Sequence, residues 1–117
     1  MTIDLKGRKI LVTGASSGIG KAIAESLSQA GATLAVHYHS NLESATSLAL
    51  KGGKGSQVFQ ANLSDNKQII RLFQDVIHAF GKIDVLVNNA GIYLYAPISD
   101  EEWLEKWHIT MQTNLTS

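Results

Sequence analysis

The 117-residue chain contains no cysteine, and its ten basic residues balance its ten acidic residues. Without cysteine it can form no disulfide bond, thiolate nucleophile, iron–sulfur cluster or cysteine-based zinc site. A formal net charge of zero provides no overall basic field that would hold nucleic acid or an anionic membrane surface. The composition therefore predicts a protein without nucleic-acid or membrane partners.

Long apolar runs and clustered histidines are also missing. No stretch approaches the ~20 apolar residues that a transmembrane helix needs, and the N-terminus is too polar for a signal peptide. None of the histidines, at His37, His39, His78 and His108, has the spacing of a helical metal site. We therefore predict one cytoplasmic domain, residues 1–117, that holds no metal.

The sequence does contain an alternation of short β-rich runs and segments with helical periodicity. Strands are predicted at residues 9–13, 33–38, 56–61 and 83–87. Helices are predicted at residues 18–30, 41–51, 66–80 and 99–114. Because right-handed crossovers between parallel strands give a doubly wound sheet, this order predicts an α/β Rossmann-type fold with strand order 3-2-1-4.

A glycine-rich loop joins the first predicted strand to the first predicted helix, with the sequence Thr13-Gly14-Ala15-Ser16-Ser17-Gly18-Ile19-Gly20. Gly14 permits a tight exit from the strand, Gly18 allows close approach of a ligand, and Gly20 allows the helix to pack on the sheet. Amides of the first helical turn and the two serine hydroxyls can then hold a pyrophosphate. The alternative is that the glycines only shape a βα turn. No Gly-Lys-Ser/Thr follows, which excludes a Walker A loop.

The Gly-x-x-x-Gly-x-Gly spacing resembles that of the short-chain dehydrogenase/reductase family. Asn88-Asn89-Ala90-Gly91 after the fourth strand resembles the family's NNAG motif, and Trp107 precedes Asn114 as in the family. Asn62-Leu63 stands where the family usually has Asp-Val or Asn-Val. The resemblance implies that Asn88 braces the sheet. It assigns cofactor binding to the loop and these motifs, namely to Gly14, Ser16, Ser17, Gly18, Ile19, Gly20, Asn62, Leu63, Asn89, Ala90 and Gly91.

The end of the second predicted strand bears on which nicotinamide dinucleotide is bound. An NAD-preferring site places a carboxylate there, and this sequence has Tyr38 instead. His39, Ser40 and Asn41 follow and offer donors to a 2′-phosphate, although no Lys or Arg stands at position 17 or 39. We therefore favour NADP over NAD and assign Tyr38, His39 and Ser40 to cofactor binding.

The acid/base chemistry of the family uses a Ser, a Tyr-x-x-x-Lys pair and an Asn, of which only the Asn has a counterpart here, Asn114. No Lys stands four residues beyond Tyr38, Tyr93 or Tyr95. The resemblance therefore implies the N-terminal cofactor-binding half of an oxidoreductase, truncated after the fourth βα unit. The complete enzyme would move hydride between NADP(H) and a small carbonyl or alcohol substrate. We expect the chain alone to be inactive.

Two other functions stay open, a non-catalytic nucleotide-binding module and an interaction half-domain that depends on a partner. The last predicted helix resembles the one with which family members form oligomers, and it carries Trp103, Trp107, Met111 and Leu115. Without further strands, the fourth strand would be an exposed edge with an apolar face. We therefore expect self-association, in the simplest case as a homo-oligomer.

Overall fold

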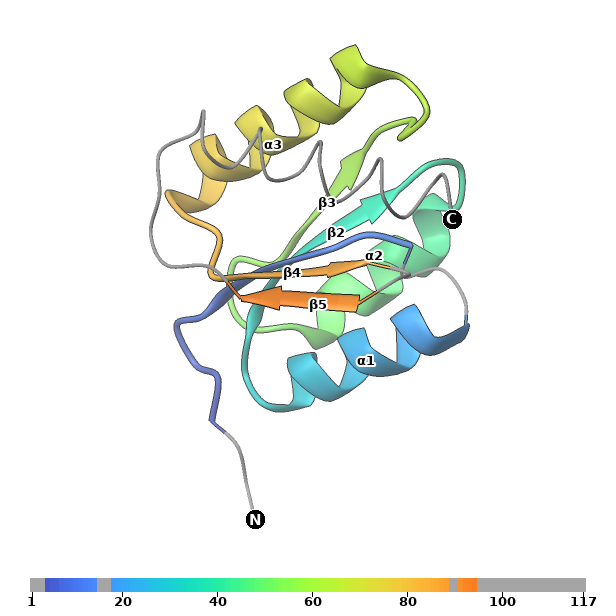
Figure 1. The fold of residues 1–117 in the computed structure, drawn as a ribbon. Coiled ribbons are helices and arrows are strands. Elements are labelled where there is room, and N and C mark those ends of the chain that lie inside the picture. Colours follow the sequence, from blue (N-terminus) through green and yellow to red (C-terminus); the bar gives the residue numbers. More distant parts are fainter. Residues whose placement is uncertain (1–3, 15–17, 89–90, 95–117) are drawn as a thin grey trace.

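The computed structural model describes residues 4–14, 18–88 and 91–94. Its elements follow in the order β1 (Lys9–Val12), α1 (Gly18–Gln29), β2 (Thr33–Tyr38), α2 (Leu42–Lys51), β3 (Gln57–Gln60), α3 (Asn66–Phe80), β4 (Val85–Asn88) and β5 (Gly91–Leu94) (Figure 1). The seven elements predicted ahead of residue 89 are all present, with ends shifted by two residues at most. The helix predicted at residues 99–114 lies outside the described residues.

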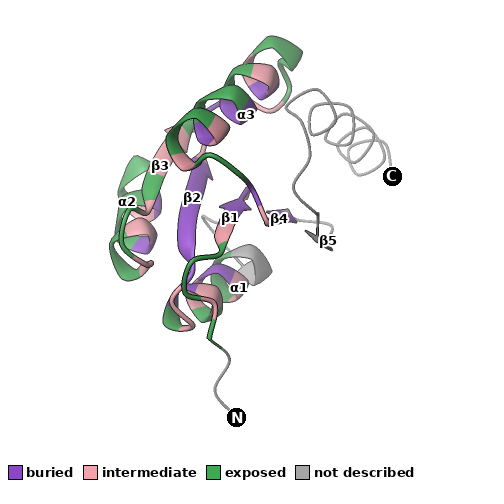
Figure 2. Cartoon of the chain, turned by 90° about the vertical axis from the view of Figure 1, so that its left-hand side faces the viewer, coloured by how far each residue is buried: buried purple, intermediate pink, exposed green. Residues whose placement is uncertain are grey.

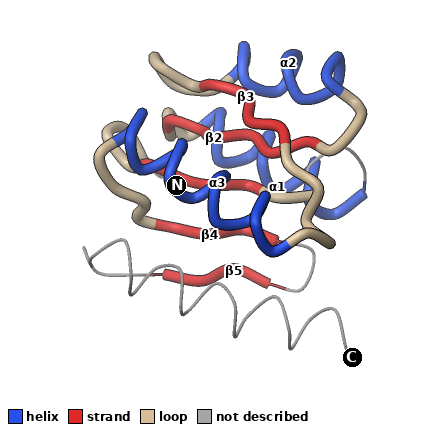
Figure 3. Tube along the Cα trace, turned by 90° about the horizontal axis from the view of Figure 1, so that it is seen from above, coloured by secondary structure: helices blue, strands red, loops and turns tan. Residues whose placement is uncertain are grey.

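The strands form one sheet in the order β3-β2-β1-β4-β5. β1 is parallel to both β2 and β4, and β2 is parallel to β3, which confirms the predicted order 3-2-1-4. A crossover connection has to bridge each parallel step, because the chain must return to the same edge of the sheet. The crossover helices therefore cover both faces, with α3 on one and α1 and α2 on the other (Figure 1), and Figure 3 shows the strands side by side.

The expectation that the fourth strand forms an exposed edge is wrong. β5 pairs with β4 in an antiparallel register, with Asn88 opposite Gly91 and Val85 opposite Leu94. Only two residues separate β4 from β5 in the sequence, and such a short connection permits an antiparallel hairpin but no parallel crossover. The apolar segment 92–94 directly after Asn88-Asn89-Ala90-Gly91 is a hairpin signal in the sequence, and the interpretation of residues 88–91 as a strand exit leaves it unused.

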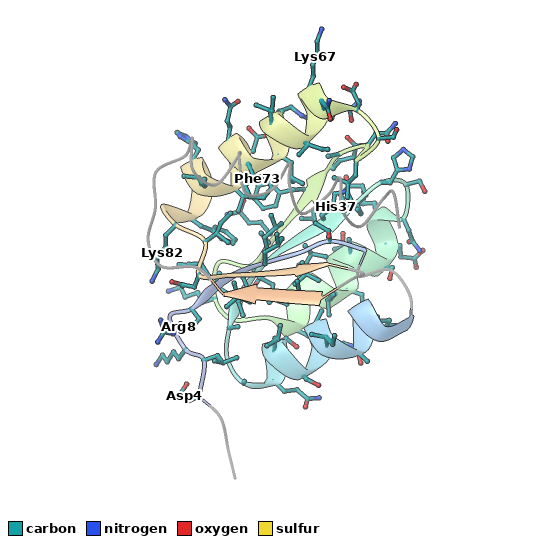
Figure 4. All side chains as sticks on the ribbon, in the orientation of Figure 1. Asp4, Arg8, His37, Lys67, Phe73 and Lys82 are labelled. Carbon is teal, nitrogen blue, oxygen red and sulfur yellow. The ribbon has the colours of Figure 1, made fainter. Side chains whose placement is uncertain are left out.

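The core consists of two apolar clusters, one on each face of the sheet (Figure 2). Successive side chains of a strand point to opposite faces, so Leu11 joins the cluster on the α3 side while Ile10 and Val12 join the other. The α3 side also buries Ala35, Ala61, Ile69, Leu72, Phe73, Val76, Ile83 and Leu86 (Phe73 is labelled in Figure 4). The side of α1 and α2 also buries Ala24, Ala32, Leu34, Val36, Ala45, Leu48 and Val87. This burial on both faces explains why β1 is a nearly continuous apolar run.

Polar caps begin α2 and α3 a few residues after the ends of β2 and β3. The Asn41 side chain accepts a hydrogen bond from the Ser44 amide at 3.1 Å, and the Asp65 side chain accepts one from the Lys67 amide at 2.9 Å. Each cap satisfies an amide that the first helical turn leaves without an intrahelical partner. The two helices therefore start at defined residues beside the carboxyl edge of the sheet.

At the opposite edge, Asp84 joins the start of β1 to the start of β4. Its carboxylate accepts a hydrogen bond from the Lys9 amide at 2.8 Å, while its own amide donates to the Lys9 carbonyl at 2.8 Å. The same carboxylate lies 3.3 Å from the Lys82 ammonium. Because the Asp84 side chain is only 12% exposed, the hydrogen bond to the Lys9 amide is largely shielded from water.

We expect Asp84→Ala to lower the free energy of unfolding by about 1–3 kcal/mol, because the Lys9 amide loses its acceptor in a half-buried position. Asp84→Asn keeps an acceptor oxygen and should cost less. Asp75→Ala, at an exposed position of α3, is the matched control. Urea denaturation measures all three variants, and equal losses for Asp84→Ala and Asp75→Ala would contradict this role of Asp84.

Candidate functional site

The carboxyl ends of the four parallel strands bring the described site residues to one edge of the sheet. β1 lies between β2 and β4, with Val12 in register with both Val36 and Val87. The chain therefore runs outward from β1 to β3 and then returns to the other side of β1. In open α/β sheets, ligands bind in the crevice at such a reversal. The described residues at this edge are Gly14, Tyr38, His39, Ser40, Asn62, Leu63 and Asn88.

Gly14 makes the exit from β1. Its φ is 67°, a conformation that residues with a side chain rarely adopt, so a glycine is favoured at this turn. The preceding residue, Thr13, is buried and donates its amide to the Val87 carbonyl at 2.8 Å, which joins the ends of β1 and β4. α1 then begins at Gly18, so the positive end of its dipole lies at the same edge.

The end of β2 presents polar groups but no carboxylate. Tyr38 is half-buried and packs against the core cluster under α1 and α2, whereas His39 and Ser40 are exposed. The following residue is Asn41, whose side-chain oxygen is used in capping α2. The groups that His39 and Ser40 can offer a ligand are therefore a ring nitrogen, a hydroxyl and backbone amides.

The turn between β3 and α3, residues 61–65, is held by its own polar groups. The Asn62 side-chain oxygen accepts from the Ser64 amide at 3.0 Å and from the Ser64 hydroxyl at 2.7 Å. Its backbone amide donates to the Gln68 side chain at 2.8 Å. The side-chain nitrogen is therefore the group that Asn62 can offer a ligand, as a donor. The next residue, Leu63, packs against the core cluster under α3.

His37 lies inside the fold near the end of β2 (Figure 4) and is only 6% exposed. Its Nε2 is 2.8 Å from the Ala61 carbonyl oxygen, which can only accept, so Nε2 carries the proton. The other ring nitrogen, Nδ1, is buried and has no hydrogen-bond partner among the described residues. Burial lowers the pKa of His37 below 6.5; the nearby His39 also lowers this pKa, and the bond to Ala61 opposes both effects.

The other predicted site residues fall into two groups, those in described elements and those outside the described residues. Gly18, Ile19 and Gly20 form the first turn of α1, and Gly91 begins β5. Five more lie outside the described residues: Ser16, Ser17, Asn89, Ala90 and Asn114.

One candidate residue was missed by the sequence analysis. A groove of about 330 Å³ separates α1 from α2, with Lys21 and Asn41 among its lining residues. The Lys21 ammonium thus lies in a groove that reaches the beginning of α2. Lys21 and Asn41 are 20 positions apart in the sequence. Only the packing of α1 beside α2 reveals that they share the groove. Three acidic or basic side chains also line the groove: Glu25, Glu43 and Lys51.

Metal and membrane features are absent from the part of the chain that the structure describes. No three histidine, aspartate or glutamate side chains there come together as a metal site. None of the three described helices has the length and apolarity that crossing a membrane requires.

A doubly wound sheet of four parallel strands, with an antiparallel fifth strand at its edge and a glycine turn after β1, defines a Rossmann-type α/β protein. The family model of the short chain dehydrogenases matches residues 8–117. The chain therefore belongs to the short chain dehydrogenase family.

Individual relatives agree with this assignment. The chain is 37% identical over 116 residues to 3beta-hydroxysteroid dehydrogenase 1 of Eggerthella lenta, covering 97% of the chain and 44% of that protein. It is 41% identical over 116 residues to the 3-oxoacyl-[acyl-carrier-protein] reductase FabG of Haemophilus influenzae, covering 97% of the chain and 46% of that protein. The chain thus spans less than half the length of these curated relatives.

Solved structures show the same fold. A dehydrogenase/reductase from Sinorhizobium meliloti superposes with a TM-score of 0.66 at 36% identity, over 83% of this chain and 40% of that one. A hydroxysteroid dehydrogenase from Escherichia coli superposes with a TM-score of 0.64 at 30% identity, over 75% of this chain and 37% of that one.

The lowered pKa of His37 predicts that acid destabilises the fold. Because the folded state binds the proton less readily than the unfolded state, the stability is full above about pH 6.5 and falls as the pH drops through that value. The urea midpoint should therefore be lower at about pH 5.5 than at about pH 7.5. His37→Gln should weaken this dependence, with His78→Gln as the matched exposed control. An equal fall in wild type and His37→Gln would contradict the assignment to His37.

Proposed function

We propose that residues 1–117 form the dinucleotide-binding domain of a short-chain NAD(P)-dependent oxidoreductase. The observation that carries this proposal is Gly14, held at a φ of 67° at the carboxyl end of the central strand. A turn of this kind, followed by the start of α1, suits a pyrophosphate because backbone amides and the positive helix end face it.

The described residues fit a dinucleotide laid across the carboxyl edge of the sheet. With the pyrophosphate at Gly14, the adenosine ribose belongs at the end of β2, beside Tyr38. The adenine then extends toward the β3–α3 turn, where Asn62 offers a side-chain donor. The nicotinamide half extends the other way, toward the end of β4. When bound, the dinucleotide supplies or accepts hydride, and the chain's own residues hold and orient it.

NADP is the cofactor that the end of β2 favours. No carboxylate stands at Tyr38, His39 or Ser40 to repel a 2′-phosphate, and His39 and Ser40 are exposed enough to donate to it. Lys21 adds a positive charge to the groove that Asn41 also lines. The acidic residues of that groove oppose this charge in part, and one of them, Glu25, lies 3.9 Å from Lys51.

The substrate proposal comes from the relatives, two of which are named as a hydroxysteroid dehydrogenase and an oxoacyl reductase. We extend their chemistry to the protein that contains this chain and propose a small carbonyl or alcohol substrate. In these 117 residues Asn114 matches the family's catalytic Asn, while the Tyr-x-x-x-Lys pair has no counterpart. The chain by itself should therefore bind the dinucleotide without transferring hydride.

We further propose that the protein is a cytoplasmic homo-oligomer, in which the segment with Trp103 and Trp107 contributes to the interface.

Gly14→Asp should lower the affinity for NADP by about tenfold or more, because its carboxylate would lie against the pyrophosphate. Isothermal titration calorimetry measures the affinity, and circular dichroism verifies the fold. Gly7→Asp is the matched control, since Gly7 also has a positive φ, 87°, but lies at the other edge of the sheet. Unchanged binding in folded Gly14→Asp would overturn the proposed function, and hydride transfer by the wild-type chain would overturn the claim that it is inactive alone.

Tyr38→Asp should shift the preference from NADP toward NAD, because a carboxylate at the end of β2 repels a 2′-phosphate and accepts from a ribose hydroxyl. Lys21→Ala should weaken NADP binding while leaving NAD binding unchanged. The measurement is the ratio of the two dissociation constants for each variant. Retention of the full NADP preference in Tyr38→Asp would show that the end of β2 does not face the 2′ position.

A further inference from the structure

Ala61 is the first residue after β3, and both of its backbone polar groups form hydrogen bonds to β2. Its amide donates to the Tyr38 carbonyl at 3.1 Å, and its carbonyl accepts from His37 Nε2 at 2.8 Å. Ala61 itself is fully buried. Both bonds come from the last two residues of the strand whose end is assigned to the adenosine ribose, so the positions of the two strand ends depend on each other.

The neighbouring residues are held from α3 instead. The Gln60 carbonyl accepts from the Arg71 guanidinium at 2.7 Å, and the Asn62 amide donates to the Gln68 side chain at 2.8 Å. The Arg71 bond is exposed to water, which weakens its net contribution, whereas the His37 bond is buried. The Gln60 side chain also donates to the His39 carbonyl at 3.2 Å, but this bond is exposed as well. The bond of His37 to Ala61 is therefore the buried side-chain bond between the end of β2 and residues 60–62.

The imidazole carries an energetic cost that an apolar side chain would not. Its Nδ1 is a buried acceptor without a partner among the described residues, and such a group costs stability. Ala35, which shares this face of β2, is fully buried in the apolar cluster under α3. The bond to the Ala61 carbonyl is what a histidine adds at this position and an apolar side chain would not.

We propose that His37 is a positioning residue for the adenosine half of the dinucleotide. By holding the Ala61 carbonyl, it keeps the β3–α3 turn in the position from which Asn62 and Leu63 meet the adenine. The proposal deepens the proposed function and rests on it. It predicts that loss of the His37 donor weakens binding of the adenosine half and leaves the nicotinamide half unaffected.

The test compares His37→Leu, which removes the donor, with His37→Gln, whose side-chain nitrogen can donate to the same carbonyl. The full chain is titrated with adenosine 2′,5′-bisphosphate and, separately, with nicotinamide mononucleotide. Hydrogen exchange of the amides at residues 61–63 is measured without ligand. His78→Leu, on an exposed histidine of α3, is the matched control. If His37→Leu does not fold, His37→Asn replaces it, because the shorter amide falls short of the Ala61 carbonyl.

We expect His37→Leu to weaken the bisphosphate about five- to tenfold, to leave the mononucleotide within about twofold, and to speed exchange at residues 61–63. His37→Gln should restore both properties. Equal weakening of the two half-ligands, or no change in affinity and exchange, would overturn the proposal. If the wild type binds neither half-ligand, the proposed function fails, and faster exchange in His37→Leu would then still show that His37 positions the turn.

Discussion

The fold depends on the parallel pairing of β1 with a strand on each side. Parallel neighbours cannot be joined by tight turns, so the chain must cross over through α1, α2 and α3. These helices bury both faces of the sheet, which accounts for the two apolar clusters. The same constraint places the carboxyl ends of the parallel strands at one edge, with the reversal of strand order beside β1. The position of the candidate site thus follows from the pairing of β1 with β2 and β4.

At that edge two turns are held by backbone conformation and hydrogen bonds. Gly14 turns sharply out of β1, and the β3–α3 turn is closed by hydrogen bonds of Asn62 to Ser64 and Gln68. A turn held in this way loses little conformational entropy when a ligand binds. The absence of a carboxylate at the end of β2, together with Lys21 in the neighbouring groove, is the basis for favouring a phosphorylated dinucleotide.

His37 shows how stability and binding are connected in this protein. A neutral imidazole suits its buried position, and the single hydrogen bond to Ala61 links two strand ends that belong to the same proposed site. The buried Nδ1 has no partner among the described residues, and burial lowers the pKa of His37. The destabilising Nδ1 and the positioning bond of Nε2 belong to the same imidazole, so stability and the proposed binding role are connected in one side chain.

The sequence by itself determined the elements ahead of residue 89, the strand order and the glycine turn at Gly14. Apolar periodicity and turn residues are local signals, and crossover handedness leaves few topologies. Only the tertiary structure decided that Lys21 shares a groove with Asn41 and that His37 donates to the Ala61 carbonyl. Each of these depends on which segments become neighbours in space. A hydrogen bond between residues 24 positions apart leaves no periodic trace in a sequence.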